Sequence, residues 1–200
     1  MTLASALAVV AIVLASDRAK DRAADLREGT AAAAPVPRFK GAELPAGVSM
    51  PDFNLRDQDG RLVSARGLRG RGPVVVTFLY THCRDTCPLT AQQVKGALDD
   101  LRSPVPAIAI SVDPPNDTPR SARAFVRKTG IGGRMRFLLG SRDELRHVWK
   151  GFAIRPQQQH LEHQARLVII DSRGMQRVGF PISQATPERI AHDLRALGAS

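Results

Sequence analysis

The chain has 200 residues, of which 43% are hydrophobic and only 4% are aromatic. This length suits one domain of ordinary size with an extension, and the apolar fraction is enough for a core built on Val, Ile, Leu and Ala. The net charge of +10 comes mostly from arginines, which are scattered and do not alternate with aromatic residues. This pattern argues against a nucleic-acid-binding protein and favours an Arg-rich surface in contact with solvent.

The first sixteen residues, MTLASALAVVAIVLAS, are apolar or small and carry no charge. They are fewer than the roughly 20 residues of a typical membrane-spanning helix, and they suit the core of a signal peptide. A basic start is missing, so an N-terminal helix packed on the domain stays open as an alternative. We expect a signal peptide or membrane anchor over residues 1–16, and a flexible or part-helical tether over residues 17–47. The folded domain, residues 48–200, is then expected outside the cytoplasm, in the periplasm or tethered to the outer face of the cytoplasmic membrane.

From residue 50 onward, the pattern of apolar residues becomes regular. Residues 52–64 alternate apolar and polar side chains around Asp59 and Gly60, which predicts a β-hairpin. The apolar, β-branched run PVVVTFLY at 73–80 predicts a central strand that is buried on both faces. The following residues, from Pro88 to Leu101, have apolar side chains at helical spacing and predict a helix.

The second half of the chain continues the alternation of strands and helices. Strands are predicted at 107–113 and 135–139, and a hairpin is predicted from the runs at 166–171 and 175–180. Capping signals predict three helices between and after these strands. These signals are Thr118-Pro119 with a closing Gly130, Ser141 with Glu144, and Thr186-Pro187 with a closing Gly198.

This order of elements predicts an α/β fold with a central mixed sheet and helices on both faces. A terminal β-β-α unit, together with a cysteine pair at the first strand-to-helix junction, is the layout of the thioredoxin-like fold. We therefore expect a thioredoxin-like domain, preceded by the N-terminal hydrophobic segment and its tether.

Cys83 and Cys87 are the only cysteines of the chain and lie in the stretch TFLYTHCRDTCPLT. Their junction is at the carboxyl edge of the sheet, where α/β proteins usually bind ligands. Because Cys87 directly precedes the predicted helix, we expect the helix N-terminus to favour a Cys87 thiolate. Residues four apart on a helical turn have Cβ atoms about 5–6 Å apart, whereas a disulfide needs about 3.5–4.5 Å. The pair can therefore form a disulfide if the loop relaxes, or bind Cu(I) or Zn(II) with a third ligand from elsewhere.

The histidines that could supply a third ligand are His82, His147, His160, His163 and His192. His147 and His192 fall in predicted helices and are expected at the surface, and His82 is expected to point away from Cys83. His160 and His163 lie in QQQHLEHQARLVIID, a polar loop that leads into the strand at 166–171. In thioredoxins a cis-proline occupies this place and holds the substrate peptide, but here no proline occurs from 158 to 167. A histidine in that place favours a metal ligand over a peptide clamp.

Three motifs in this order, YTHCRDTCP, SVDPPNDTP and EHQARLVIID, resemble the Sco/SenC family of copper chaperones for cytochrome c oxidase assembly. FNLRDQDGRLVS and FLLGSRDELRHVWKGFAI extend the resemblance over about residues 50–198. The resemblance implies a thioredoxin-like domain on a membrane tether that binds one copper ion, Cu(I) or Cu(II), through two cysteines and a distant histidine. Carried over by motif, these ligands are Cys83, Cys87 and His163. His163 is preferred to His160 because it lies eight residues before Asp171, as in the family.

The chain also departs from the family pattern near the expected site. Arg84 stands where a proline usually follows the first cysteine, and Asn116 replaces a common arginine. Glu162 replaces the aspartate that usually precedes the histidine, so the charge is kept. Asp113 matches the family. We expect Asp113 and Glu162 to lie behind the ligands and to orient them.

The resemblance implies a metallochaperone that passes copper to the dinuclear copper site of cytochrome c oxidase subunit II, or to another copper-receiving protein. The alternative is an exported thiol–disulfide oxidoreductase in which Cys83 and Cys87 form the redox disulfide, and the same pair can serve both roles. The absent cis-proline argues against broad dithiol exchange. A peroxiredoxin requires a threonine three residues before its cysteine, whereas Thr81 lies two before Cys83. An interaction domain without chemistry leaves the placement of both thiols unexplained.

Overall fold

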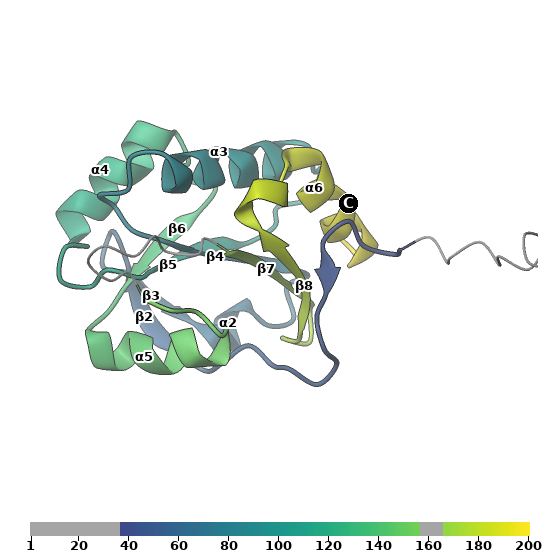
Figure 1. Cartoon of the computed structure of the whole chain (residues 1–200), viewed down its shortest axis with the longest axis horizontal. Coiled ribbons are helices and arrows are strands. Elements are labelled where there is room, and N and C mark those ends of the chain that lie inside the picture. Colours follow the sequence, from purple (N-terminus) through teal and green to yellow (C-terminus); the bar gives the residue numbers. More distant parts are fainter. Residues whose placement is uncertain (1–36, 157–165) are drawn as a thin grey trace, which may run out of the picture. The chain divides into compact units, whose positions relative to one another are not determined.

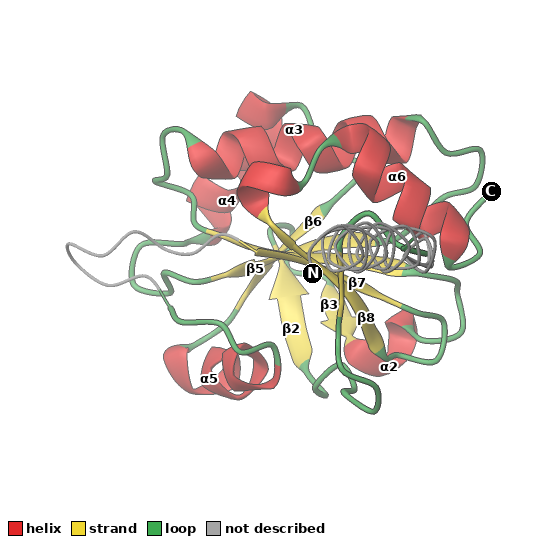
Figure 2. Cartoon of the chain, turned by 45° about the vertical axis from the view of Figure 1, so that its right-hand side comes forward, coloured by secondary structure: helices red, strands yellow, loops and turns green. Residues whose placement is uncertain are grey.

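The computed structural model describes residues 37–156 and 166–200. This part of the chain contains an eight-stranded mixed sheet with the strand order β1-β8-β7-β4-β5-β6-β2-β3. Figures 1 and 2 show α3, α4 and α6 on one face of the sheet, and α5 and α2 on the other. The predicted signal peptide or anchor, residues 1–16, lies outside the described residues. In the described part, the helices fall short of the length and apolar character that a membrane crossing requires.

The first half of the domain contains β1 (Ala42–Glu43), β2 (Asn54–Asp57), β3 (Leu62–Ser64), α2 (Ala65–Leu68), β4 (Val74–Leu79) and α3 (Thr86–Asp99). The predicted hairpin is confirmed, because β2 and β3 pair antiparallel. Its turn is closed by the Asp57 carboxylate, which accepts hydrogen bonds from the backbone N–H groups of Asp59 and Arg61 at 3.0 and 2.9 Å. Gly60 has a φ of 81°, a conformation that glycine adopts without strain.

The second half contains β5 (Ala107–Ser111), α4 (Pro119–Thr129), β6 (Arg136–Leu139), α5 (Arg142–Gly151), β7 (Arg166–Ile170), β8 (Gln176–Pro181), the 3₁₀ turn η1 (Ile182–Gln184) and α6 (Pro187–Ala196). The predicted caps are confirmed at the start of all three of these α-helices. Thr118 and Ser141 form capping boxes, and the Thr186 hydroxyl accepts a hydrogen bond from the backbone of its helix. Gly130 closes α4 in the left-handed conformation.

The sheet separates two hydrophobic cores. β4 pairs parallel with β5 and antiparallel with β7, so it is central, and every one of its residues is buried. Val75 and Leu79 point into the core beneath α3, α4 and α6, while Val76 and Phe78 point into the core beneath α5. This alternation explains why β4 reads as a continuous apolar run.

The folded domain begins earlier than the predicted boundary at residue 48. The compact unit starts at Arg38, and β1 pairs antiparallel with β8. Phe39 is 4% exposed and lies in the core with α3 and α6. The Asp193 carboxylate, on α6, accepts hydrogen bonds from the backbone N–H groups of Lys40 and Gly41 at 2.7 and 2.8 Å. A two-residue strand and a single phenylalanine leave no periodic pattern, so residues 38–47 resembled a tether in the sequence.

Replacing Asp193 with alanine should lower the free energy of unfolding by about 2 kcal/mol, because two backbone N–H groups then lose their acceptor. Asp193 is fully buried, so water cannot easily replace it. Asp100→Ala is the matched control: Asp100 pairs with Arg195 at 2.8 Å but is 60% exposed, and its loss should cost less than about 1 kcal/mol. Urea unfolding of both variants measures this difference. Equal effects would show that residues 40–41 are not anchored by Asp193.

Candidate metal centre

The two cysteines lie where β4 passes into α3. The helix begins at Thr86, two residues before the predicted start at Pro88, so Cys87 is its second residue and does not precede it. Pro88 is then the third helical residue. Its lack of an N–H costs no hydrogen bond, because N–H groups in the first turn have no partner within the helix. Cys83 lies just outside the helix, and its sulfur accepts a hydrogen bond from the Cys87 backbone N–H at 3.1 Å.

The two thiols have opposite electrostatic environments. The pKa of Cys83 is lowered to about 6 by hydrogen bonds, although burial acts in the opposite direction. The largest effect comes from the Cys87 thiol, and smaller ones come from the Cys87 backbone N–H, the Tyr80 hydroxyl and the Asp85 backbone N–H. The pKa of Cys87 is raised, first by the hydrogen bond between its thiol and Cys83 and then by burial, since Cys87 is 1% exposed. Burial and the hydrogen bond with Cys83 raise the pKa of Tyr80 to about 12. The expectation that the helix N-terminus favours a Cys87 thiolate is therefore wrong, because the pKa of Cys87 is raised and the pKa of Cys83 is lowered.

The reduced, metal-free protein should become more stable as the pH rises from about 6 to 9.0. The lower limit is the pKa of Cys83 in the fold, and the upper limit is the ordinary pKa of a cysteine thiol. The pKa of Cys83 is depressed in the fold, so its contribution to stability is complete above 9.0 and is lost as the pH falls through about 6. The pKa of Cys87 is raised, so its contribution is lost above 9.0. Urea unfolding at both ends of the window measures the rise. Cys83→Ser should remove it, and an unchanged rise in that variant would contradict the assignment.

A buried carboxylate that the sequence analysis missed holds the start of the cysteine loop. Asp117 is 7% exposed and accepts hydrogen bonds from the backbone N–H and the hydroxyl of Thr81, both at 2.7 Å. It also accepts one from the Ser111 hydroxyl at 2.5 Å. The pKa of Asp117 is raised, because burial outweighs these hydrogen bonds. The signal in the sequence was a carboxylate directly before the helix cap Thr118, after a buried strand.

Asp113, the expected orienting residue, lies in the same loop but has a different partner. Its carboxylate accepts hydrogen bonds from the Asn116 side-chain amide at 3.1 and 2.9 Å. Its charge nevertheless contributes to the raised pKa values of Tyr80 and Asp117. Asp113 therefore acts on Tyr80 and Asp117 through its charge, while Asp117 makes the direct contacts with the start of the cysteine loop and helps to raise the pKa of Cys87.

The histidines divide into three described residues and two that are not described. His147 and His192 are exposed on α5 and α6, as expected. His82 is exposed, and its Nδ1 lies 3.1 Å from the Thr81 hydroxyl. His160 and His163, together with Glu162, lie outside the described residues. Across residues 37–156 and 166–200, no three His, Cys, Asp or Glu side chains gather closely enough to hold a metal ion.

The topology nevertheless places the start of β7 at the same edge of the sheet. β7 runs antiparallel to β4, with Leu167 opposite Thr77. The Thr77 hydroxyl donates a hydrogen bond to the Arg166 carbonyl at 3.2 Å. The first residue of β7 therefore lies beside the end of β4 that leads to the cysteines. Two thiols at this edge supply soft ligands for Cu(I) or Zn(II) and can also form a disulfide.

The sequence matches the model of a known protein family. A family model described as SCO1/SenC matches residues 42–199. The chain belongs to the SCO1/SenC family. The sequence-based resemblance is confirmed, and the match includes the early strand β1.

Curated relatives with sequence similarity include Sco proteins and one protein of another description. The chain is 28% identical over 106 residues to the mitochondrial protein SCO1 homolog 1 of Arabidopsis thaliana, covering 51% of this chain and 31% of the relative. It is 30% identical over 84 residues to the SCO1 protein homolog of Bacillus subtilis, covering 40% and 43%. It is also 39% identical over 80 residues to alkyl hydroperoxide reductase E of Mycobacterium tuberculosis, covering 36% and 48%. The chain thus spans less than half the length of these curated relatives.

Solved Sco structures match over much more of their length. The copper-bound ScoI of Bradyrhizobium japonicum is 29% identical with a TM-score of 0.59, covering 73% of this chain and 97% of that one. BsSco is described as having a disulfide switch and as a member of the Sco family of cytochrome c oxidase assembly proteins. It is 25% identical with a TM-score of 0.67, covering 78% and 96%. These matches confirm the predicted α/β, thioredoxin-like fold.

Proposed function

We propose that this Sco-family protein is a copper-binding metallochaperone that holds one copper ion, Cu(I) or Cu(II), through Cys83, Cys87 and His163. The observation that carries the proposal is the preformed thiol pair, in which the Cys83 sulfur accepts the Cys87 backbone N–H at 3.1 Å. The thiolate is the form that binds metal, and Cys83 is held in that form near neutral pH. The relative from Bradyrhizobium japonicum, whose structure is described as copper-bound, supports this choice of metal.

The two cysteines have different tasks in this proposal. Cys83 is half-buried and offers a thiolate at the surface, so it makes the first bond to copper. Cys87 is buried and protonated, so it loses its proton when the metal reaches it. Copper loading should therefore release a proton. Asp113 and Glu162 orient the site, and His163 supplies the nitrogen donor.

The proposed recipient is the dinuclear copper site of cytochrome c oxidase subunit II, to which the protein delivers copper or whose thiols it reduces. The family affiliation and the description of BsSco support this recipient. The proposed location is the outer face of the cytoplasmic membrane or the periplasm, with residues 1–16 as signal or anchor. A reporter enzyme fused after residue 37 tests the location, because wholly cytoplasmic activity would contradict it.

Anaerobic copper titration of the reduced protein should give one bound copper ion per chain, and oxidation to the Cys83–Cys87 disulfide should abolish binding. The reason is that a disulfide sulfur no longer offers a thiolate to the metal. Cys83→Ser and Cys87→Ser are the controls, and each should lose binding without an oxidant. A stoichiometry that is the same before and after oxidation would contradict the proposed ligands.

A second function, thiol–disulfide exchange, is favoured by the contrast between the two thiols. The Cys83 thiolate can attack a disulfide of a partner and displace one partner thiol. Cys87 then attacks the mixed disulfide, which releases the second partner thiol and leaves the Cys83–Cys87 disulfide. Cys87→Ser should trap the mixed disulfide on an oxidised dithiol peptide. The same variant should accumulate no mixed disulfide if the protein acts only on copper.

A further inference from the structure

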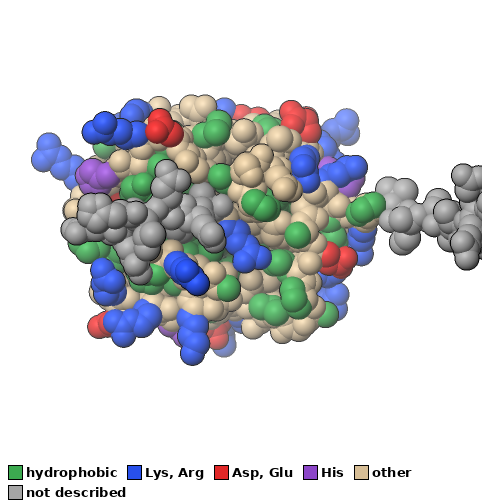
Figure 3. All heavy atoms as spheres, viewed as in Figure 1, with side chains coloured by type: hydrophobic (Ala, Val, Ile, Leu, Met, Phe, Trp, Pro, Cys, Tyr) green, Lys and Arg blue, Asp and Glu red, His purple; other side chains and the backbone are tan. Residues whose placement is uncertain are grey.

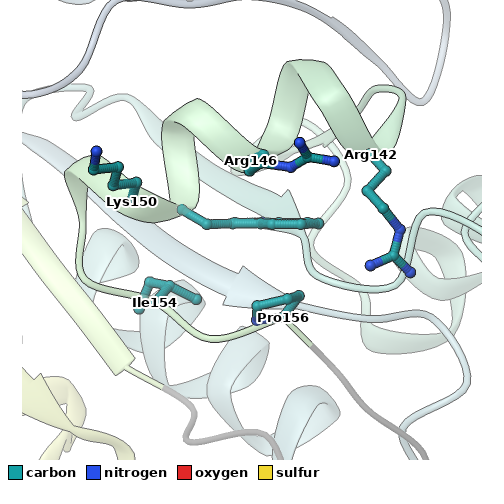
Figure 4. A pocket seen from close by; sticks show the side chains of 6 residues that line it. Arg142, Arg146, Lys150, Ile154 and Pro156 are labelled. Atoms are coloured by element: carbon teal, nitrogen blue, oxygen red, sulfur yellow. The ribbon is translucent and has the colours of Figure 1, made fainter.

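Helix α5 carries a stripe of basic side chains beside a pocket. Arg142, Arg146 and Lys150 follow one another at intervals of four residues, so they share one side of the helix. Figure 4 shows these cations along the helix, with Ile154 and Pro156 across from them. The pocket has a volume of about 260 Å³ and is lined by these five residues and Trp149.

The apolar lining of the pocket is fixed in place. Trp149, the only tryptophan of the chain, is 3% exposed, and its indole N–H donates a hydrogen bond to the Ser111 carbonyl at 2.9 Å. Ile154 is 8% exposed and belongs to the same core. Ser111 ends β5, and its hydroxyl bonds Asp117. The pocket is therefore attached to the end of β5 that also supports the cysteine loop, but it opens beside α5.

Within residues 37–156 and 166–200, only one of the three cations at this pocket forms an ion pair. Among the described residues, neither Arg142 nor Lys150 forms an ion pair, and Arg146 pairs at 2.8 Å with Asp143, where both side chains are exposed. Glu144, on the same helix, accepts hydrogen bonds from the backbone N–H and the hydroxyl of the cap residue Ser141. Figure 3 shows blue side chains gathered at the lower left, where Figure 1 places α5.

The helix macrodipole accounts for Lys150, which lies in the last turn of α5, but not for Arg142. Arg142 is the first residue of α5, at the end of the helix where the macrodipole disfavours a positive charge. A cation at that position, beside an apolar pocket, is suited to bind an anionic group from outside the molecule.

We propose that this pocket is a docking site for an acidic segment of a partner protein that carries an apolar side chain among its carboxylates. The carboxylates pair with Arg142 and Lys150, and the apolar side chain contacts Trp149 and Ile154. An anionic membrane is disfavoured, because the surface is concave and its apolar residues are buried, so none projects to insert into lipid. The proposal does not rest on copper binding, since the pocket contains no proposed copper ligand.

The indole N–H signal of Trp149 in a ¹⁵N-labelled full chain reports directly on this pocket. The probe is a synthetic peptide in which four glutamates flank one phenylalanine. We expect a saturable shift of the indole signal on titration with this peptide. Replacing the glutamates with glutamines, or the phenylalanine with serine, should each weaken binding by about tenfold. A missing or non-saturable shift overturns the proposal.

Two double variants with the same change in net charge separate docking from general attraction. Arg142→Glu with Lys150→Glu should weaken peptide binding at least about tenfold, because both anchoring cations are reversed. Arg127→Glu with Lys128→Glu, on the exposed side of α4, should leave it within about twofold. Equal losses in the two variants overturn the proposal.

Vesicles and copper titration complete the test. Vesicles of phosphatidylcholine with phosphatidylserine are the lipid probe. Binding to vesicles that depends on Arg142 and Lys150, with no binding of the peptide, overturns the proposal in favour of a membrane contact. Both double variants should load copper like the parent chain. Loss of peptide binding with copper loading intact therefore concerns only the pocket, whereas failure of the parent chain to bind copper concerns only the proposed function.

Discussion

Replacing Asp117 with alanine should lower the free energy of unfolding by about 3 kcal/mol, whereas asparagine there should cost less than about 1 kcal/mol. Alanine leaves the Thr81 backbone N–H, the Thr81 hydroxyl and the Ser111 hydroxyl without their common acceptor. Asparagine keeps an oxygen for Thr81, and its amide can donate to Ser111 instead. Because burial raises the pKa of Asp117, the ionised carboxylate is costly in the fold, and a neutral amide avoids that cost.

Urea unfolding of the two variants measures these differences, and Asp113→Ala is the control. Asp113 lies in the same loop, but its partner is the exposed Asn116 amide, so its loss should cost less than about 1 kcal/mol. The Asp117→Ala variant should also lose the low pKa of Cys83, because Thr81 no longer fixes the start of the loop. Similar stabilities for the alanine variants of Asp113 and Asp117 would show that Asp117 does not hold the loop.

The strands and helix caps were predictable because their signals are local. The apolar run at 73–80 identifies β4, since a strand buried on both faces needs an apolar side chain at almost every position. Thr118, Ser141 and Thr186 identify helix starts, since each hydroxyl accepts a hydrogen bond from the first turn of its own helix.

The features that sequence reasoning missed depend on contacts between distant segments. β1 exists because β8 and Asp193 provide partners for residues 40–43. Asp117, rather than Asp113, supports the cysteine loop because it is the carboxylate that is buried between Thr81, after β4, and Ser111, at the end of β5. The pKa of Cys83 is lowered because its sulfur faces the thiol and the backbone N–H of Cys87 and accepts hydrogen bonds from both. The order of residues alone does not determine that direction.

Replacing His163 with alanine should weaken Cu(II) binding by more than about 100-fold. Removing a group that only orients a metal ligand costs up to about 100-fold in metal affinity, and losing the ligand itself should cost more. Two thiolates leave Cu(II) short of donors, and imidazole suits this ion. Cu(I) accepts two soft ligands, so its binding to Cys83 and Cys87 should fall far less. The absorption band of thiolate-to-Cu(II) charge transfer measures the first effect, and anaerobic Cu(I) titration measures the second.

His160→Ala is the matched control for His163, because both histidines come from the same polar stretch before β7. They are three residues apart, an odd number, so an extended chain directs their side chains to opposite sides. β7, the strand that this stretch precedes in the sequence, begins beside the end of β4 that leads to the cysteines. His160→Ala should therefore keep the absorption band. Loss of the band in His160→Ala but not in His163→Ala would transfer the ligand to His160, and a band that survives both would make His82 the next residue to replace.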